Sequence, residues 1–389
     1  MRETYTCIVL GLGGIGSAAA YWLSRRLGAD VLGLEQFELG HLRGGSHDHS
    51  RIIRLSYHTP NYVKLAKQAY RAWEMVEAES GEQLLFKTGS LDLFPADGYI
   101  PLNDYTYSMD ASGVPYERLS AYEVQRYWPP FHLTDDVQGL FQADGGFVAA
   151  ARATAAHQRL AQENGATLRD HTPVTAIRAT GGAIEVEAGP HTYQCQKLII
   201  ASGAWSNHHL AHFGQRVNLT VTQEQVNYFA SPHLADFAPE RFPVWIWMDE
   251  PCFYGFPVYG EAAVKVNQDV GGEEVTVESR TFEANAAALQ RTTDFMARVL
   301  PSACGPLHFS KTCLYAMPPD RDFVLDTLPG LPDVSLAIGA GHAFKYASLL
   351  GLILSQLALD GGAAAYDLSP FSFSRSILHE ENPVREFMI

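Results

Sequence analysis

The spacing of apolar and polar residues near the N-terminus predicts a strand, a helix and a second strand, in that order. Residues 6–10 form a short apolar run rich in β-branched side chains, as in a buried strand. An Ala- and Leu-rich segment that ends at Leu27 predicts a helix, and the apolar run over residues 31–34 predicts the next strand. Together these segments indicate a βαβ unit.

The turn between the first strand and the helix carries a glycine fingerprint, Gly11-Leu12-Gly13-Gly14-Ile15-Gly16. Gly11 permits the tight turn, Gly13 lets the backbone approach a pyrophosphate, and Gly16 allows the helix and strand to pack closely. Glu35 ends the second strand and can accept hydrogen bonds from a ribose. Such turns also occur without a ligand, but here both strands, the helix and the acid are in place. The unit therefore predicts dinucleotide binding, without separating FAD from NAD.

Apolar periodicity continues the alternation of elements toward the middle of the chain. It predicts helices over residues 62–79 and 149–164, and an irregular, loop-rich stretch that reaches to about Phe141. The buried run that starts at Lys197 leads into a glycine turn and is expected to rejoin the first sheet. The nucleotide domain is therefore predicted to be interrupted in sequence.

Residues 218–308 are rich in aromatic side chains and alternate in places with the period of a strand. We interpret them as a mostly antiparallel sheet that roofs the cofactor and forms an apolar pocket. The predicted fold class is α/β (α+β), with a discontinuous Rossmann-like domain and a mostly antiparallel substrate domain. The first domain is assigned residues 1–90, 145–217 and 309–389, and the second is assigned residues 91–144 and 218–308.

Composition narrows the classes of partner. The chain has 389 residues, 47% of them hydrophobic, and a formal net charge of -15. That charge argues against nucleic acid and against anionic membrane surfaces as partners. Five scattered cysteines suit a reducing compartment, and the longest apolar run, near residues 349–359, is too short to span a bilayer. We expect a soluble, cytoplasmic protein without a cleavable N-terminal segment.

Three cationic sites stand out against this acidic background. Arg51 and Arg54 follow the ribose-binding strand and, if extended, point to opposite faces, one toward the cofactor and one toward a ligand. Lys265 interrupts a strand-like apolar run, for which an edge or solvent-facing position is the usual explanation. Lys345 follows a glycine-rich turn and begins a helical run, an arrangement that favours anions. The alternatives are a solvated basic loop for the arginines and a structural turn with a solvated lysine for Lys345.

These segments together resemble the monomeric sarcosine oxidase family, which also includes N-methyltryptophan oxidase and pipecolate oxidase. The resemblance extends along nearly the whole chain in the family's order. It is carried by the glycine fingerprint, Ser46-His47 through Arg51-Ile52-Ile53-Arg54, Phe253-Tyr254-Gly255-Phe256-Pro257, Lys265, Lys311-Thr312-Cys313-Leu314-Tyr315 and Gly341-His342-Ala343-Phe344-Lys345.

The resemblance implies an FAD-binding domain, with the cofactor held covalently through Cys313 as an 8α-S-cysteinyl thioether. It implies catalytic roles for Lys265, Arg51, His47 and Tyr254, and substrate binding by Arg54, Lys345 and Tyr254. Without the flanking motif, Cys313 would be interpreted as a buried small hydrophobe. The full set of expected cofactor-binding residues is Gly11, Gly13, Gly14, Ile15, Gly16, Glu35, Ser46, His47, Arg51, Val174, Ser202, Gly203, Trp205, Cys313, Gly339, Gly341, His342, Phe344 and Lys345. No metal-ligand constellation is evident, so no metal is expected.

The resemblance also implies the reaction. A flavin-dependent oxidase would demethylate N-methyl amino acids such as sarcosine with O2 and water, giving the amino acid, formaldehyde and hydrogen peroxide, as a monomer. Several cations around the substrate amine disfavour its protonated form, so no general base is nominated. Lys265 is the candidate that stabilises charge as O2 is reduced.

Other functions stay open at this point. They are an oxidase of a bulkier N-methyl or cyclic amino acid (N-methyltryptophan or pipecolate), a flavin dehydrogenase with another acceptor, an NAD-dependent dehydrogenase and a non-catalytic flavoprotein. Asp269 stands where relatives often have His, and residues 56–60 also depart from the family pattern, which puts the identity of the substrate in question.

Overall fold

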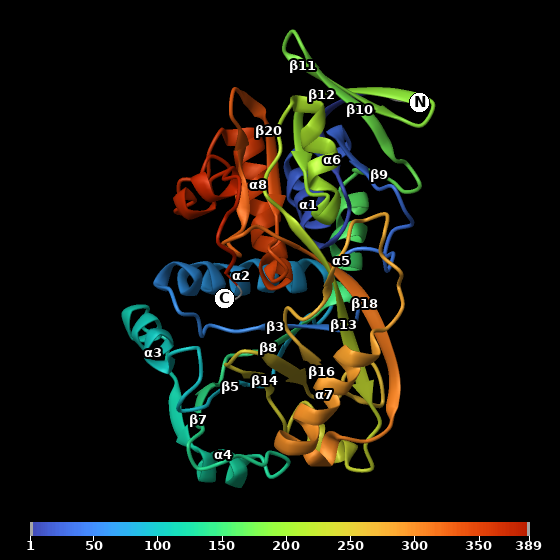
Figure 1. Cartoon of the computed structure of the whole chain (residues 1–389). Coiled ribbons are helices and arrows are strands. Elements are labelled where there is room, and N and C mark those ends of the chain that lie inside the picture. Colours follow the sequence, from blue (N-terminus) through green and yellow to red (C-terminus); the bar gives the residue numbers. More distant parts are fainter. Residues whose placement is uncertain (1–2, 387–389) are drawn as a thin grey trace.

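The first strand lies at the centre of a sheet in the computed structural model, which describes residues 3–386 (Figure 1). Strand β1 (Thr4–Leu10) pairs in parallel with β2 (Val31–Leu34) on one side and with β12 (His191–Ile200) on the other. Both faces of β1 are covered, because Cys7 and Val9 join one apolar cluster while Ile8 and Leu10 join another. The predicted βαβ unit is confirmed, and so is the return of the chain to this sheet.

Further strands complete this eight-stranded sheet on both sides. Strand β9 (Thr167–Arg169) pairs beside β2, and β20 (Leu331–Ile338) pairs in parallel with β12. Antiparallel neighbours extend it, namely β10 (Val174–Thr180), β11 (Ala183–Ala188) and β19 (Val324–Leu328).

Three helices pack together against this sheet: α1 (Gly14–Leu27), α5 (Ala150–Glu163) and α8 (Ala347–Asp360). The indole Nε1 of Trp22 on α1 donates a hydrogen bond of 2.8 Å to the carbonyl of Ser348 on α8. A Cβ atom at Gly351 would lie 2.5 Å from the backbone carbon of Ala18, so glycine permits the close crossing of α1 and α8. Helix α2 (Pro60–Ser80) lies across the middle of the molecule and contacts α8 and α5 (Figure 1).

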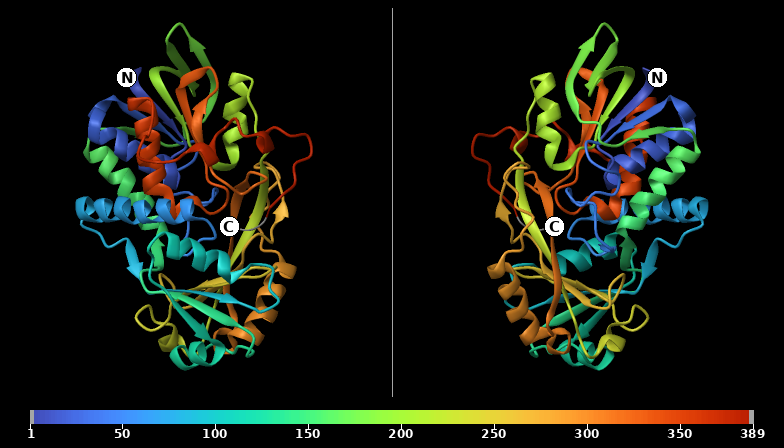
Figure 2. Two further views of the ribbon diagram at one scale, coloured as in Figure 1. Left: turned by 90° about the vertical axis from the view of Figure 1, so that its left-hand side faces the viewer. Right: turned by 90° about the vertical axis from the view of Figure 1, so that its right-hand side faces the viewer.

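The second sheet has nine strands and lies in the other half of the molecule (Figure 2). Its order is β17-β13-β16-β15-β14-β5-β7-β6, with β18 paired to β13, and β14–β5 is a parallel pair. The expectation of a mostly antiparallel sheet is confirmed. Its strands are β5 (Ser90–Phe94), β6 (Glu117–Ser120), β7 (Gln138–Gln142), β13 (Thr220–Phe229), β14 (Val244–Trp247), β15 (Phe253–Phe256), β16 (Val264–Gln268), β17 (Glu273–Glu274) and β18 (Leu307–Met317).

A small sheet and several short elements connect the two halves. The small sheet consists of β3 (Ser50–Ile53), β8 (Gly146–Ala149) and β4 (Leu85–Lys87). The domain boundary proposed at residue 309 falls within strand β18. The division of the chain into two domains remains a prediction. Two further helices are α6 (Ser206–Leu210) and α7 (Ala286–Val299). Short 3-10 turns are η1 (Gly28–Asp30), η2 (Gly203–Trp205), η3 (Ala211–Phe213), η4 (Leu234–Phe237), η5 (Pro301–Ala303), η6 (Ala343–Tyr346), η7 (Ser369–Phe371) and η8 (Ser376–Leu378).

Two expectations were wrong. The stretch up to Phe141 is regular, because it contains α3 (Leu102–Ala111), β6, α4 (Ala121–Tyr127) and β7. Ser120 and Glu123 form a capping box at the start of α4, and the Ser-x-x-Glu spacing was a visible signal for it. An edge or solvent-facing position for Lys265 is also wrong, since β16 lies between β13 and β15 and the lysine is 3% exposed.

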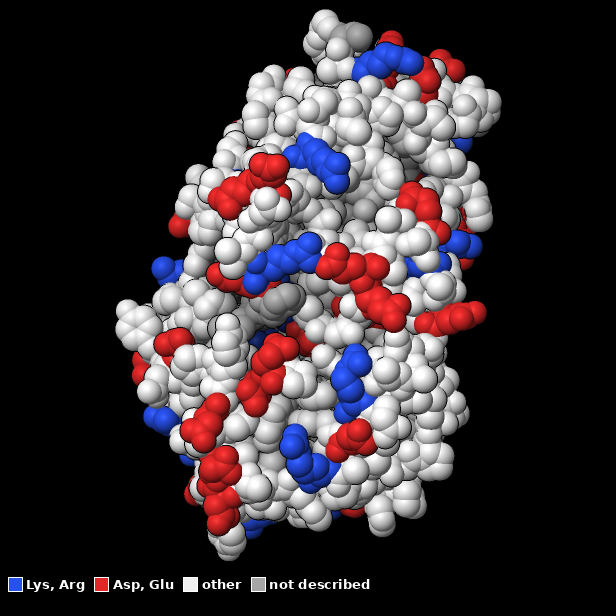
Figure 3. Space-filling model, viewed as in Figure 1, with Lys and Arg blue, Asp and Glu red and all other residues white. Residues whose placement is uncertain are grey.

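The surface charges and the helices can be described directly from the structure. Acidic and basic side chains are interspersed over the face shown in Figure 3. In the part of the chain that the structure describes, every helix is too short or too polar to cross a bilayer. Within the same residues, His, Cys, Asp and Glu side chains form no cluster suited to a metal ion.

Substitution of Gly351 by Ala is expected to destabilise the protein. The new methyl group would meet the backbone of α1 at 2.5 Å, and overpacking of this kind costs about 1–3 kcal/mol. That loss opposes the gain of about 1 kcal/mol that Ala has over Gly inside a helix. We expect a net decrease of up to about 2 kcal/mol in the unfolding free energy, measured by denaturant titration.

Gly362→Ala is the matched control, because a Cβ atom there meets nothing within 4 Å. It should leave stability unchanged or raise it by a few tenths of a kcal/mol, roughly. Equal effects of the two substitutions would contradict the close helix crossing.

Candidate active site

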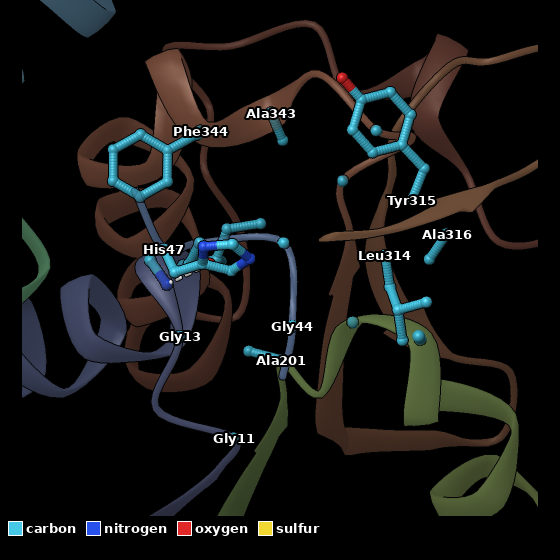
Figure 4. Close-up of a pocket in the computed structure, with 18 of the residues that line it drawn as sticks. Gly11, Gly13, Gly44, His47, Ala201, Leu314, Tyr315, Ala316, Ala343 and Phe344 are labelled. Atoms are coloured by element: carbon cyan, nitrogen blue, oxygen red, sulfur yellow. Dashed lines mark hydrogen bonds between the residues drawn. The ribbon is translucent and has the colours of Figure 1, made fainter. Parts of the chain in front are cut away.

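A cavity of about 600 Å³ extends from the glycine turn to residues of the second sheet. Its walls come from both halves of the molecule and from the segment of residues 40–54. Figure 4 shows His47 and Phe344 on one side of the cavity, with Leu314, Tyr315 and Ala316 of β18 on the other. The fold thus gathers side chains that are more than 260 residues apart in sequence.

The nucleotide end of the cavity is shaped by the glycines. Gly11 has φ +85°, and a Cβ atom there would lie 2.7 Å from the carbonyl oxygen of Ala201. A Cβ atom at Gly16 would lie 1.8 Å from the carbonyl oxygen of Gly11, so Gly16 permits the packing of α1 on β1. Gly13 at the N-terminus of α1 has no side chain, and the amide of Gly14 donates a hydrogen bond of 2.9 Å to Ser46 Oγ. The first turn of such a helix favours a phosphate through its amide groups and its dipole.

The acid at the end of β2 closes this cradle. Glu35 Oε2 accepts a hydrogen bond of 2.8 Å from the amide of Leu12, and Oε1 accepts one of 3.1 Å from the amide of Phe37. Burial raises the pKa of Glu35, but the bonds from His41 and from these amides outweigh burial and hold it below its ordinary value. An ionised acid in this position matches the ribose hydroxyls of a dinucleotide.

Most of the residues expected to bind the cofactor line the cavity. The exceptions are Gly16, which packs behind the turn, and Cys313. Arg54 and Tyr254 also line the cavity, whereas Lys265 does not. The lining members of the expected cofactor set are Gly11, Gly13, Gly14, Ile15, Glu35, Ser46, His47, Arg51, Val174, Ser202, Gly203, Trp205, Gly339, Gly341, His342, Phe344 and Lys345.

The sequence interpretation also missed several lining residues. Phe37 and His41 lie two and six residues after Glu35, in the loop at the carboxyl end of a parallel strand, where ligands of this fold bind. That position was a usable signal. Gln158 on α5 gave none, because only the fold brings its amide to the carbonyl of Leu12, at 3.0 Å.

Arg51 and His47 shape the cavity wall next to the glycine turn. The guanidinium of Arg51 donates to the carbonyls of Gly45, His47 and Ser50 at 2.7–3.0 Å. Burial and the positive charge of Arg51 lower the pKa of His47 to about 3, so its imidazole is neutral. Its Nε2 lies 3.1 Å from the carbonyl of Thr312 and therefore carries the proton. Its Nδ1 has no hydrogen-bond partner within residues 3–386.

At the far end of the cavity, two cations stand among apolar walls. Arg54 Nη1 lies 2.9 Å from Asp92 Oδ1, both side chains are buried, and Asp92 also accepts a bond of 2.5 Å from Ser56. Burial, and next the nearby Arg54, lower the pKa of Lys345 to about 7. The apolar walls here are Ile100, Ile246, Met248 and Phe256.

Asp269 also lines this end of the cavity, just beyond the end of β16. Its carboxylate is 3.2 Å from Arg321 Nη1 and accepts a hydrogen bond of 3.3 Å from the hydroxyl of Tyr315. Arg54 and Arg321 each contact an acid. For Lys345, the described residues provide no acid in contact.

Comparison with known proteins identifies the family. Residues 6–357 match the family model of the FAD-dependent oxidoreductases known as DAO. The chain belongs to this family. It is similar to monomeric sarcosine oxidase of Streptomyces avermitilis, with 35% identity over 372 residues that cover 94% of this chain and 96% of the relative.

Two other relatives show the range of named activities. N-methyl-L-tryptophan oxidase of Salmonella heidelberg is 30% identical over 377 residues, covering 95% of this chain and 99% of that protein. Among solved structures, NikD, an unusual amino acid oxidase essential for nikkomycin biosynthesis, superposes with a TM-score of 0.86 at 26% identity. The match covers 98% of this chain and 100% of NikD. The predicted fold class and family resemblance are confirmed.

The residues of this FAD-dependent oxidoreductase fit the cofactor. The N-terminus of α1 and Glu35 suit the pyrophosphate and a ribose, and a Cβ atom at Gly13 would lie 3.0 Å from Ser46 Oγ. The cavity continues from there past His47 and Arg51 to the apolar walls, where a flavin ring would be held.

Two residues expected at the flavin are placed behind the cavity wall. Cys313 on β18 is buried, and burial raises the pKa of its thiol to about 11 against the opposing charge of Arg51. The Nζ of Lys265 lies 2.6 Å from Asp48 Oδ2 and donates to the carbonyl of Ser50 at 3.0 Å. Asp48 was not assigned a role from the sequence.

Substitution of Asp92 by Ala is expected to destabilise the protein strongly. It would leave the guanidinium of Arg54 buried without its counter-charge, and breaking a buried pair in this way costs about 3–5 kcal/mol. The measurement is the unfolding free energy. Asp360→Ala removes the half-exposed pair with Arg26 and should cost less than about 1 kcal/mol. A loss at Asp92 no larger than that of the control would contradict the pairing.

Proposed function

We propose that this FAD-dependent oxidoreductase is an oxidase that demethylates N-methyl amino acids such as sarcosine. O2 and water would be consumed, and the amino acid, formaldehyde and hydrogen peroxide would be released. The observation that carries the proposal is one cavity that joins a dinucleotide cradle to a compartment with two cations and apolar walls. The names of the relatives, sarcosine oxidase and N-methyl-L-tryptophan oxidase, support the same class of reaction.

The bound flavin would supply the redox chemistry, taking two electrons from the carbon–nitrogen unit and delivering them to O2. The protein would hold the substrate in position for it. Arg54 and Lys345 would bind the substrate carboxylate, and Asp92 fixes the orientation of the guanidinium through its 2.9 Å contact. Ile246, Met248 and Phe256 provide apolar surface for an N-methyl group or a side chain, with Tyr254 beside them.

The reactive amine must be neutral, and the charges around it favour that form. Arg51 and Arg54 remain charged, and Lys345 adds a further positive charge when it is protonated. A further cation placed among them is disfavoured. The pKa of an ammonium substrate would therefore be lower there than in water. We therefore assign no general base. His47, with its pKa lowered to about 3, remains neutral at the wall.

Cys313 is the proposed point of covalent attachment, through a thioether to the 8α carbon of the flavin. The chain places it on β18 directly before Leu314, which lines the cavity. Its environment contains the positive charges of Arg51 and Lys265, which oppose the effect of burial on the thiol. Mass spectrometry of the peptide that contains Cys313 tests the attachment, which predicts the added mass of FAD.

A bulkier N-methyl amino acid or a cyclic amino acid is the alternative substrate. Asp269 with its partners Arg321 and Tyr315 gives this end of the cavity a polar corner that glycine-sized substrates would leave unused. A flavin dehydrogenase with another acceptor is the alternative reaction. We further propose that the protein is a cytoplasmic monomer.

The deciding experiment is an anaerobic titration of the purified protein with N-methyl and cyclic amino acids, followed by bleaching of the flavin absorbance. Bleaching by at least one of these compounds, followed by stoichiometric peroxide on admission of air, is expected. Absence of bleaching by the whole panel would contradict the proposal, and bleaching without peroxide would favour the dehydrogenase.

Binding of a small carboxylate should weaken as pH rises through the pKa of Lys345. The free protein carries the Lys345 proton below about pH 7 and loses it above, so the dissociation constant of acetate should be flat below pH 7. Above pH 7 it should increase up to about tenfold per pH unit. Perturbation of the flavin absorbance measures the binding. Lys345→Met should bind weakly and without this pH dependence; a retained dependence would exclude Lys345 as its source.

Lys265→Met should slow the reaction of the reduced protein with O2. Loss of a fixed positive charge at a site where negative charge develops costs roughly 10²–10³-fold in rate. Stopped-flow measurement of reoxidation is expected to show this loss. The rate of anaerobic reduction by substrate should stay within about threefold of the wild-type rate, because the substrate contacts are assigned to other residues. Equal losses in the two half-reactions would argue against a specific role in the O2 step.

A further inference from the structure

The segment before β3 contains a buried acid that the proposed function has not used. The Asp48 side chain is 0% exposed. Its Oδ2 lies 2.6 Å from Lys265 Nζ and 3.9 Å from Arg51 Nη1, and its Oδ1 lies 3.5 Å from Lys311 Nζ. Oδ1 also accepts a hydrogen bond of 2.8 Å from the hydroxyl of Tyr228. One carboxylate thus faces three cations and a phenol.

The backbone at Asp48 is in a conformation that favours glycine. Its φ is +85°, in the left-handed half of the map, where an L side chain is strained. Its carbonyl accepts a hydrogen bond of 3.1 Å from Ala151, and that of His49 accepts one of 3.0 Å from Ala150, so the segment is fixed to the start of α5. Glycine would adopt this backbone conformation without strain. What an aspartate adds at position 48 is therefore the set of contacts made by its carboxylate.

The surroundings of Lys265 make Asp48 its compensating charge. The segment before β3 and β3 itself contribute Asp48, the Ser50 carbonyl and Arg51. Strand β13 contributes Tyr228, β15 the ring of Phe256 at 4.4 Å, and β18 contributes Cys313 directly and Lys311 through Asp48. Behind Tyr228 stand His49 and Glu261, which pair with each other at 3.0 Å.

These charges act on the two members of the pair in opposite senses. Burial raises the pKa of Asp48, but Lys265 and Arg51 outweigh it and hold that pKa well below its usual range. Burial lowers the pKa of Lys265 to about 8, the negative charge of Asp48 opposes this, and Arg51 adds to the lowering. Removal of the Asp48 charge would leave both burial and Arg51 acting against the ammonium.

We infer that Asp48 is a positioning residue for the O2 step, which fixes the Lys265 ammonium between its carboxylate and the Ser50 carbonyl and keeps it charged. The inference rests on the proposed function, because it gives Lys265 the role of stabilising negative charge as O2 is reduced. Tyr228 orients the carboxylate from its other oxygen. Without the charge of Asp48, burial and Arg51 would lower the pKa of Lys265 further.

The test uses the flavin-loaded protein and the substitutions Asp48→Asn and Asp48→Gly. Asn keeps the size of the side chain without its charge, and Gly also relieves the strained φ. In the wild type, the rate of reoxidation should fall above about pH 8 as Lys265 loses its proton. In both variants this fall should move down by about one pH unit or more, since an opposite charge at this distance shifts a pKa by about 1–3 units. At pH 8 the rate should be lower by roughly fivefold or more.

A spectral titration of the oxidised flavin gives a readout independent of turnover. The wild-type absorbance should change with a midpoint near pH 8, the midpoint should be lower in Asp48→Asn, and the change should be absent in Lys265→Met. Asp48→Asn should have no further effect on reoxidation in the Lys265→Met background. Anaerobic reduction by substrate should stay within about threefold in both Asp48 variants.

Several results would overturn the inference. One is a pH profile in Asp48→Asn that matches the wild type, even if the variant melts at a lower temperature. Others are an undiminished effect of Asp48→Asn in the Lys265→Met background, or wild-type behaviour of Asp48→Gly. Failure of the proposed function is distinguishable, because a protein that releases no peroxide would still show the coupled spectral titration if Asp48 governs Lys265.

Discussion

The buried carboxylate of Asp48 constrains how the two halves of the molecule meet. A charge without access to water must be paired, and here the partners come from β16, β18 and the start of β3. Tyr228 on β13 supplies the remaining hydrogen bond. These segments belong to different sheets, so the pairing fixes the wall of the cavity relative to the glycine turn. A shift of one strand would leave at least one buried charge unmatched.

At the other end of the cavity, buried cations also need negative partners, and not all of them have one among the described residues. Arg54 is matched by Asp92, and Arg321 is matched by Asp269. Lys345 has neighbours of both signs but no acid in contact among residues 3–386, and its pKa of about 7 reflects burial together with the charge of Arg54. Under the proposed function, an anion of one negative charge would complete the ion pairs at this end of the cavity. A substrate with a single carboxylate would have this property.

Local sequence patterns predicted those features of the fold that depend on a short stretch of the chain. The apolar run of β1 and the tight turn at Gly11, which has φ +85°, were interpreted correctly. The contact of Glu35 with a ribose remains a prediction. The burial of Lys265 could not be deduced in this way, because a lysine in an apolar run fits an edge strand equally well until the partner of its charge is known. Asp48 lies 217 positions earlier in the chain, and nothing in its own segment marks it as that partner. Asp92 was missed for the same reason, since only the fold brings it to Arg54.

The two lysines with lowered pKa values would respond differently when the site is loaded. Under the proposed function, Lys345 would have a negative partner only while a carboxylate is bound, so substrate would raise its pKa and product release would lower it again. Lys265 has a permanent partner in Asp48, so its charge depends little on whether substrate is present. Under the proposed function this separation is useful, because O2 reacts after the amine has been oxidised. A positive charge that depended on the substrate carboxylate would vary with occupancy at the step that needs it, whereas the Asp48–Lys265 pair is part of the protein throughout.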